Sequence, residues 1–264
     1  MTDFNEEKQT PEAEERFSDV IVGRNPVTEA LRSGREIDKL LVAHGAAEGS
    51  VKAIIAKCRE RGILVKEVAP QKLDFMSGGA SHQGVALVVA AHKYCSVDDI
   101  LQFAEEKGES PFVIICDGIE DPHNLGAIIR TAEACGVHGI IIPQRRSASL
   151  NAVVAKAAAG ALEYMKVARV TNLSAEIDRL KEKGMWIYAA DMDGDSWCST
   201  DMKGSCGLVI GSEGRGVSRL VKDKCDKIVS LPMLGNINSL NASVAAGILM
   251  YEIVRQRGSI KSIN

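Results

Sequence analysis

The sequence of 264 residues lacks the marks of several protein classes. No apolar run approaches the roughly 20 residues that a membrane helix needs. The first 19 residues contain no basic segment followed by an apolar core, so no secretory signal is expected. The nucleotide-binding patterns GxGxxG, after a first strand, and GxxxxGK[ST] are also absent, so the usual phosphate cradles are excluded. We expect a protein without a membrane segment in a reducing cytoplasm.

Cysteine is present but is not arranged for disulfides or metal. The seven cysteines are odd in number and never spaced as CxxC, and the five histidines do not cluster with them. Neither a disulfide framework nor a metal site is therefore expected. We interpret them as small buried residues rather than catalytic thiols; they are Cys58, Cys95, Cys116, Cys135, Cys198, Cys206 and Cys225.

The net charge of −3 is unevenly distributed. Residues 1–19 hold seven acids and two bases, and residues 95–110 hold five acids and one base. Residues 20–94 hold eleven bases and seven acids, and residues 111–264 hold eighteen bases and sixteen acids. The small basic excess of residues 20–94 permits contact with RNA without requiring it.

Five segments follow from this pattern. Residues 1–19 are predicted to be a disordered acidic tail. Residues 20–94 alternate strands and helices as a small α/β domain, in which a helix is expected from Pro26 to Arg32 and another opens at Ser50 as N-cap. Residues 95–110 form a linker with a short acidic helix capped by Ser96. Residues 111–258 form a second domain, and residues 259–264 a tail.

The second domain is predicted to contain a parallel sheet. FVIIC, GIIIP, MWIYAA, GLVIG and KIVSLP are apolar runs of strand length, and a segment of helical period follows each of the first four. Continuous apolar strands that alternate with helices indicate a parallel sheet covered on both faces. A closing helix is expected from about Leu240 to Gln256.

Ligands bind at the carboxyl ends of the strands in such a sheet, and three of these ends are polar and rich in glycine. They are the segments DGIEDPHNLGAIIR (117–130), SEGRGV (212–217) and MLGNINSLNAS (233–243). In order and spacing they resemble the three motifs of the SpoU family of RNA 2′-O-ribose methyltransferases, in the SPOUT superfamily. GRNPVTEAL (23–31) and HQGV (82–85) also resemble the substrate-binding domain of the branch that methylates 23S ribosomal RNA.

The resemblance implies the fold, the cofactor and the assembly. It implies an α/β catalytic domain with a parallel sheet tied in a deep trefoil knot, preceded by a small α/β RNA-binding domain similar to ribosomal-protein modules. S-adenosyl-L-methionine is expected to bind in the knotted crevice of a homodimer.

The resemblance also implies the site residues. Those that match catalytic positions are Arg130, Asn124, Glu213, Ser239 and Asn241. Those that match positions whose main chain holds the cofactor are Gly211, Leu231 and Leu240. Arg24 and Asn25 match the RNA-binding domain.

Ordinary structural roles remain open for the same residues. Arg130 suits a solvated helix face, Asn124 the N-cap or first turn of a helix, and Ser239 a helix cap. Asn25 before Pro26 also suits an N-cap. The family arginine is proposed to help deprotonate the 2′-hydroxyl, yet guanidinium stays protonated far above neutral pH, so Arg130 either has a strongly lowered pKa or orients the substrate.

We therefore expect an RNA methyltransferase that acts on a guanosine of 23S ribosomal RNA. Transfer RNA is the alternative substrate, and a non-catalytic protein that binds RNA or assembles ribosomes is the alternative class. The small first domain favours ribosomal RNA, since such modules bind structured RNA by shape and backbone.

Overall fold

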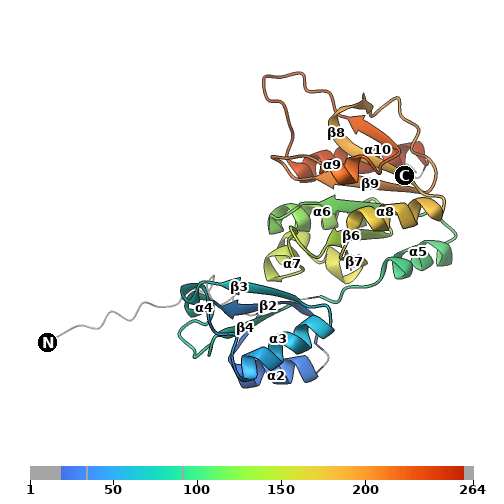
Figure 1. Ribbon diagram of the computed structural model, residues 1–264. Helices are drawn as coiled ribbons and strands as arrows, with labels where there is room; N and C mark the ends of the chain where they lie inside the picture. Colours follow the sequence, from blue (N-terminus) through green and yellow to red (C-terminus); the bar gives the residue numbers. More distant parts are fainter. Residues whose placement is uncertain (1–18, 34, 91, 259–264) are drawn as a thin grey trace. The chain divides into compact units, whose positions relative to one another are not determined.

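The computed structural model describes residues 19–33, 35–90 and 92–258. The chain forms two compact units (Figure 1): one contains the chain up to His92 with Ser149–Ala152, and the other contains Lys93–Ala148 and the chain from Val153 onward. The tails predicted at 1–19, apart from Asp19, and at 259–264 lie outside the described residues.

A four-stranded mixed sheet forms the centre of the first unit, in the order β1-β4-β2-β3. β4 pairs antiparallel with both β1 and β2, and β2 pairs parallel with β3. The strands are β1 (Val20–Val22), β2 (Ile37–Ala43), β3 (Leu64–Val68) and β4 (Val85–Val89).

Alternation along these strands places apolar side chains on both faces of the sheet. Leu40 and Val42 join a core with the helices α2 (Arg24–Arg32) and α3 (Ser50–Glu60). Leu41 and Ala43 join a second core with α4 (Pro70–Met76). Both faces of this small sheet are therefore covered.

Two predicted helix caps in this unit are wrong, although α3 opens at Ser50 as predicted. α2 begins at Arg24, so Asn25 lies in its first turn and is not its N-cap. α3 begins at Ser50, so Ser50 is not its cap either. The cap positions are Gly23 and Gly49, whose positive φ angles of 94° and 53° suit glycine. The Ser50 hydroxyl instead accepts a hydrogen bond from Arg24 at 3.4 Å.

The second unit contains a six-stranded sheet in which every pairing is parallel, as predicted. Its order is β10-β8-β9-β5-β6-β7. The sequence analysis missed the short strand β7 and ended β8 too early. The strands are β5 (Phe112–Asp117), β6 (Gly139–Pro143), β7 (Val167–Val170), β8 (Trp186–Ser196), β9 (Cys206–Gly211) and β10 (Lys227–Ser230).

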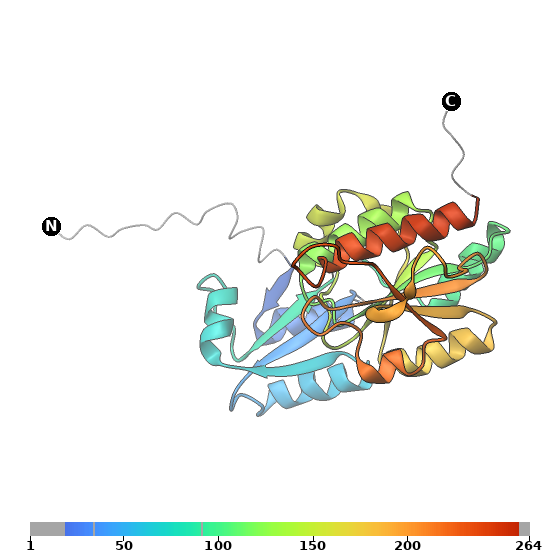
Figure 2. The same cartoon turned by 90° about the horizontal axis from the view of Figure 1, so that it is seen from above.

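Helices cover both faces of this sheet. Figure 2 shows α6 (Pro122–Ala134) and α10 (Ala242–Gln256) on one face and α8 (Leu173–Glu182) and α9 (Arg219–Lys222) on the other. The remaining helices of this region are α5 (Val97–Glu106), α7 (Ala152–Ala158) and the 3-10 turn η1 (Ala161–Glu163).

The segment predicted as a linker contributes to this core. Ser96 caps α5 in a capping box with Asp99, and the side chains of Val97 and Ile100 are buried against the six-stranded sheet. Across the described ranges, no helix is both long and apolar enough to cross a bilayer.

The closing helix differs from its prediction in two respects. α10 begins at Ala242, two residues later than expected, and its cap is Asn241 rather than Ser239. Within the helix, Met250 is fully buried. The outward residues are Val244, Ile248 and Tyr251, which are 50%, 37% and 49% exposed.

Candidate functional site

The carboxyl ends of four adjacent strands, β10, β8, β9 and β5, form one edge of the second sheet. From β5 the chain moves to β6 on one side, whereas from β9 it moves toward β10 on the other. The boundary between β5 and β9 is therefore a topological switch point, where parallel α/β sheets bind ligands. The loops after β5 and β9 meet there, since Asp117 Oδ2 accepts a hydrogen bond from the main-chain N–H of Ser218 at 2.7 Å.

The loop after β9 turns too tightly for a side chain at its first position. Ser212 and Gly216 exchange main-chain hydrogen bonds of 3.1 and 2.8 Å. A Cβ on Gly211 would lie 2.1 Å from the carbonyl carbon of Gly216, closer than real Cβ atoms approach. Glycine is therefore required at 211 for the chain to make this turn.

Three predicted site residues form one hydrogen-bonded group. Asn124 donates from Nδ2 to Glu213 Oε1 at 2.7 Å. Asn241 donates from Nδ2 to Asn124 Oδ1 at 2.9 Å and to the same Glu213 oxygen at 2.5 Å. We call this group the Asn–Glu–Asn triangle. It joins the first turn of α6, the loop after β9 and the cap of α10.

Capping explains why the two asparagines face each other. Asp121 caps α6 by accepting from the N–H of His123. Asn124 therefore lies in the first turn of the helix, which is one of the two positions predicted for it. The Oδ1 atom of Asn241 accepts from the N–H groups of Ser243 and Val244, which leaves its Nδ2 free to reach Asn124 and Glu213.

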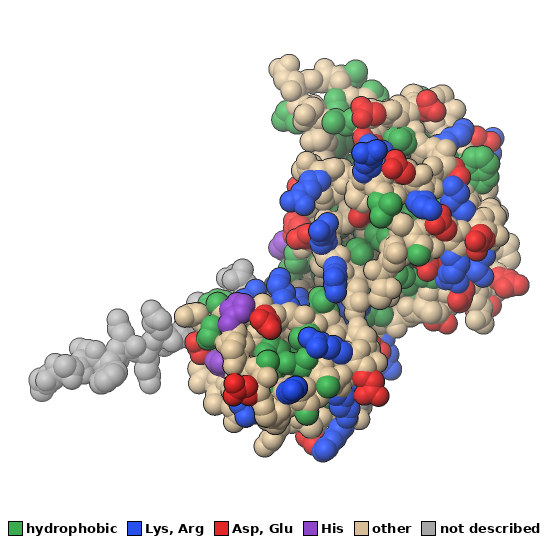
Figure 3. Space-filling model, viewed as in Figure 1, with side chains coloured by type: hydrophobic (Ala, Val, Ile, Leu, Met, Phe, Trp, Pro, Cys, Tyr) green, Lys and Arg blue, Asp and Glu red, His purple; other side chains and the backbone are tan. Residues whose placement is uncertain are grey.

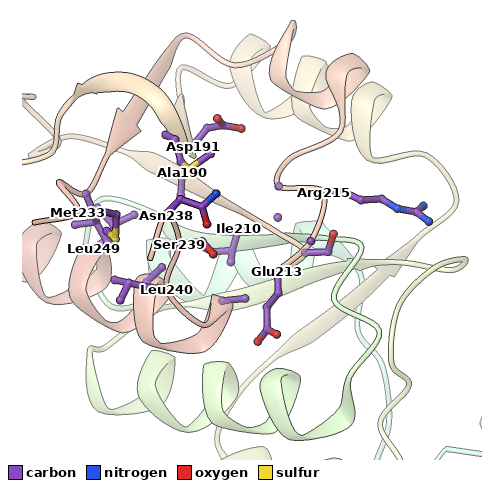
Figure 4. A pocket seen from close by; sticks show the side chains of 18 of the residues that line it. Ala190, Asp191, Ile210, Glu213, Arg215, Met233, Asn238, Ser239, Leu240 and Leu249 are labelled. Carbon is purple, nitrogen blue, oxygen red and sulfur yellow. The ribbon is translucent and has the colours of Figure 1, made fainter. Parts of the chain in front are cut away.

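A cavity of about 470 Å³ lies beside the triangle. Its wall includes all three residues expected to hold the cofactor, Gly211, Leu231 and Leu240, together with Ser239 and Glu213. Figure 4 shows Ser239 and Asn238 turned into the space between the labelled walls, and Glu213 pointing toward the pale green helix α6. Apolar side chains complete the wall, among them Ile210, Val229, Met233 and Leu249.

The sequence analysis missed one acidic residue of this wall. Asp191 follows the run MWIYAA and lines the cavity. Its carboxylate is mostly buried and is held by Lys222 Nζ at 2.6 Å. A polar residue after a buried parallel strand is the same signal that revealed the other loops, so this position could have been found.

A second cavity, of about 430 Å³, shares the loop 212–216 with the first. Asn124 lies in its wall, with Arg146 from the loop after β6 and the loop after β5.

Arg130 lies apart from both cavities. It is exposed on α6, and it makes no hydrogen bond or ion pair with the residues that the structure describes. Arg24 and Asn25 are exposed in the first unit. The Arg24 guanidinium donates to the main-chain oxygen of Gln83 at 3.2 Å, so part of its role is to brace that loop.

None of the seven cysteines lines either cavity, and Cys198 is exposed, so the interpretation of all seven as buried residues is wrong at that position. Burial raises the pKa of the thiols of Cys58 and Cys135 to about 11 and of Cys116 and Cys225 to about 12. The described parts of the chain contain no group of three or more His, Cys, Asp or Glu residues that could hold a metal ion.

Family models match nearly the whole chain. The SpoU rRNA methylase family matches residues 111–251, and the RNA 2′-O ribose methyltransferase substrate-binding family matches residues 20–95. YacO of Bacillus subtilis (strain 168), assigned to the TrmH family of tRNA/rRNA methyltransferases, is 47% identical over 92% of this chain and 97% of its own.

Solved structures of this family have the same fold. The SpoU methyltransferase AviRb of Streptomyces viridochromogenes, in complex with AdoMet, has a TM-score of 0.58 and 26% identity, covering 91% of this chain and 90% of its own. The AdoMet-bound rRNA methyltransferase of Sinorhizobium meliloti has a TM-score of 0.57 and 25% identity, covering 96% and 92%. The TrmH/SpoU tRNA-modifying enzyme of A. aeolicus has a TM-score of 0.53 and 28% identity, covering 62% and 84%.

The parallel sheet, the three polar loops that converge at its switch point and these matches have one explanation. The chain belongs to the SpoU family of RNA methyltransferases.

Proposed function

We propose that the protein methylates the 2′-hydroxyl of a ribose in RNA with S-adenosyl-L-methionine as cofactor. The observation that carries this proposal is the convergence of all three motifs: the Asn–Glu–Asn triangle lies beside a cavity lined by Gly211, Leu231 and Leu240. A non-catalytic RNA-binding protein would have no need of this polar group.

The cavity suits the cofactor. Its volume is within the range of small-molecule sites, and its wall is mostly apolar with a few polar groups. Gly211 allows the tight turn of the loop at the cavity wall, and the carboxylate of Asp191 provides an acceptor for hydroxyl or ammonium groups. We propose that Gly211, Leu231 and Leu240 hold the cofactor.

S-adenosylmethionine supplies an activated methyl group when it is bound, so the protein must position the ribose and assist removal of its proton. We propose that Asn124, Glu213 and Asn241 fix the loop after β9 against α6 and α10. Ser239, on the cavity wall, contacts the reacting ribose. Arg130 binds and orients the RNA, because a guanidinium makes two-pronged contacts with phosphate.

We propose that residues 20–94 bind the RNA and residues 111–258 carry the reaction. The two family models match these segments separately. Arg24 and Asn25 are exposed for contact with RNA, although Arg24 also braces Gln83. In Figure 3, basic and acidic side chains are interspersed on the visible face. Residues 20–94 hold only a small basic excess, within a chain of net charge −3.

The preferred substrate is a guanosine of 23S ribosomal RNA. The rRNA methyltransferase of S. meliloti matches 96% of this chain, whereas the tRNA-modifying enzyme of A. aeolicus matches 62%. The first unit accounts for about a third of this chain, so a match to 96% of the chain includes it. Because the relative that shares this unit is an rRNA methyltransferase, the coverage favours ribosomal RNA. Transfer RNA is the second candidate, since the name of the B. subtilis relative includes both substrates.

The resemblance also supports a trefoil knot, a homodimer and a cytoplasmic location, which we include in the proposal. For the dimer, the structure offers the exposed residues Val244, Ile248 and Tyr251 along one side of α10. The loop from Leu231 to Asn241 adds Leu234 and Ile237, 97% and 75% exposed.

Methyl transfer from a radiolabelled donor to unmodified 23S ribosomal RNA and to unmodified transfer RNA tests the function. We expect label in ribosomal RNA, as 2′-O-methylguanosine. Arg130→Ala and Arg130→Lys should both lose transfer while S-adenosylhomocysteine binds normally, because lysine cannot make a planar two-pronged contact. Arg219→Ala, which removes an arginine 95% exposed on α9, is the control.

Three outcomes would contradict the proposal. Label in neither RNA would favour the non-catalytic class, and label in transfer RNA alone would favour the second substrate. Near-normal turnover by Arg130→Lys would show that only positive charge is needed at position 130.

A further inference from the structure

Two arginines of the second cavity have no side-chain partner among the residues that the structure describes. Arg146 and Arg215 both line it, and neither makes a hydrogen bond or ion pair with any residue described. An unpaired guanidinium on a cavity wall, beside a proposed methyl-transfer site, indicates an anionic ligand.

The acids of this cavity are mostly occupied. Asp117 accepts from the N–H of Ser218, Asp121 caps α6, and Glu213 belongs to the Asn–Glu–Asn triangle. Glu120 is the remaining carboxylate; it is exposed and has no such contact with the described residues. Hydrogen bonds from neutral groups leave these carboxylates charged, but among the described residues none of them forms an ion pair with Arg146 or Arg215. Both guanidinium groups therefore remain available to an anion.

Arg146 also has an uncommon main-chain conformation. Its φ is +56°, in the left-handed region that residues other than Gly, Asn and Asp rarely adopt. The next turn of the loop is fixed, because Ala148 donates to the carbonyl oxygen of Ile119 at 2.7 Å. Backbone strain of this kind clusters at ligand-binding sites, where it is part of the function.

We propose that Arg146 binds a phosphate of the RNA strand in the second cavity and so positions the reacting nucleotide. This proposal rests on the proposed function. Arg215 lines both cavities, whereas Arg146 lines only the second, whose wall includes none of the proposed cofactor residues Gly211, Leu231 and Leu240. The planar guanidinium fits two phosphate oxygens at once.

The neighbouring arginine provides a matched control. Arg145 is exposed and lines neither cavity. Arg146→Ala should raise the KM for RNA about tenfold, as expected for one lost charge-assisted contact, while Arg145→Ala changes it little. The affinity for S-adenosylhomocysteine should stay within about twofold in both variants, since the cofactor cavity is unaltered.

Two further variants separate charge from backbone. Glu120→Gln removes a negative charge from the same cavity and should lower the KM for RNA. Arg146→Gly relieves the left-handed strain and should unfold at a temperature no lower than Arg146→Ala, while losing RNA affinity equally. In both Arg146 variants, the log–log salt slope of RNA binding should be shallower by about one unit for duplex RNA and about 0.7 for a single strand.

The outcomes distinguish this proposal from the proposed function. Equal effects at Arg145 and Arg146, or a wild-type KM in Arg146→Ala, would overturn it while methyl transfer by the wild type stands. A fall in S-adenosylhomocysteine affinity in Arg146→Ala would assign Arg146 to the carboxylate of the donor instead. If the wild type binds RNA but transfers no methyl group, a weaker, less salt-dependent complex of Arg146→Ala would support the phosphate contact without the reaction.

Discussion

Asn124 and Glu213 lie 89 positions apart in the sequence, and a hydrogen bond of 2.7 Å joins the amide nitrogen of the one to the carboxylate of the other. Asn241 donates to both. The carboxylate of Glu213, which is exposed, thus accepts from two amide donors, and one of them belongs to the buried Asn124.

Asn124→Asp tests this arrangement with almost no change of shape. It replaces a donor by a second carboxylate facing Glu213, and Asn124 is buried. At pH 7 we expect a loss of about 1–3 kcal/mol in the free energy of unfolding, measured by denaturant titration. Asn236→Asp, at an exposed loop position, should change it by less than about 0.5 kcal/mol. Equal losses would show that the triangle contributes nothing to stability.

Gly211→Ala should abolish binding of S-adenosylhomocysteine. The added methyl group would collide with Gly216, so the loop after β9 must open. Gly204→Ala, where a Cβ meets no atom within 4 Å, is the control and should bind normally. Isothermal titration calorimetry measures both, and unchanged binding by a folded Gly211→Ala variant would remove this loop from the cofactor site.

The exposed apolar residues of α10 predict self-association. Light scattering should give the mass of a dimer at micromolar concentration, since a two-fold pairing is the commonest way to cover such a face. Ile248→Glu should shift the mass toward the monomer, because it places a charge in the interface. Leu220→Glu, at a residue 64% exposed on α9, should leave the dimer intact. A monomeric wild type would contradict the proposal.

His138 predicts a pH-dependent stability. Its ring is buried, with Nδ1 accepting from the N–H of Phe112 and Nε2 donating to Glu109, so the neutral ring satisfies both contacts. Burial lowers the pKa of His138 below its ordinary value, although Glu109 acts in the opposite direction. The unfolded chain therefore binds the proton more readily, and stability falls as the pH decreases through about 6.5.

The measurement is the thermal midpoint of unfolding at pH 7.5 and at pH 5.5. The decrease between the two should be smaller in His138→Asn than in the wild type, while His123→Asn, at an exposed position, should behave as the wild type. An unchanged decrease in His138→Asn would assign the pH dependence to other groups.

Much of the second unit could be predicted from its apolar runs. Three of the five predicted strands, FVIIC, GIIIP and GLVIG, end within one residue of their observed ends. Continuous apolar runs of this kind are typical of strands in a sheet that is covered on both faces. β7 was missed because it has four residues, among them Arg169, and lies at the edge of the sheet, where it pairs with β6 and, through a single bridge, with Cys95. β8 continues through Asp-Gly-Asp because β10 pairs with it after a register shift, a long-range effect without a local signal.

The site was predictable in its residues but not in its geometry. The motifs name Asn124, Glu213 and Asn241, yet only the folded chain shows that one oxygen of Glu213 serves both amides. Ser239 was a reasonable cap by type, but Asn241 takes that role because its carbonyl reaches the first N–H groups of α10. No sequence pattern indicated Arg146, because a positive φ at a residue other than glycine cannot be recognised in a single sequence.

The triangle also determines when the site can exist. Asn241 and α10 come last among the elements that build it, so a growing chain that has reached only Glu213 has the loop but neither the second amide nor the covering helix. Contacts across more than a hundred residues form slowly compared with local ones. A nascent chain therefore passes through most of its synthesis without an assembled site, and cofactor binding reports the completion of the fold.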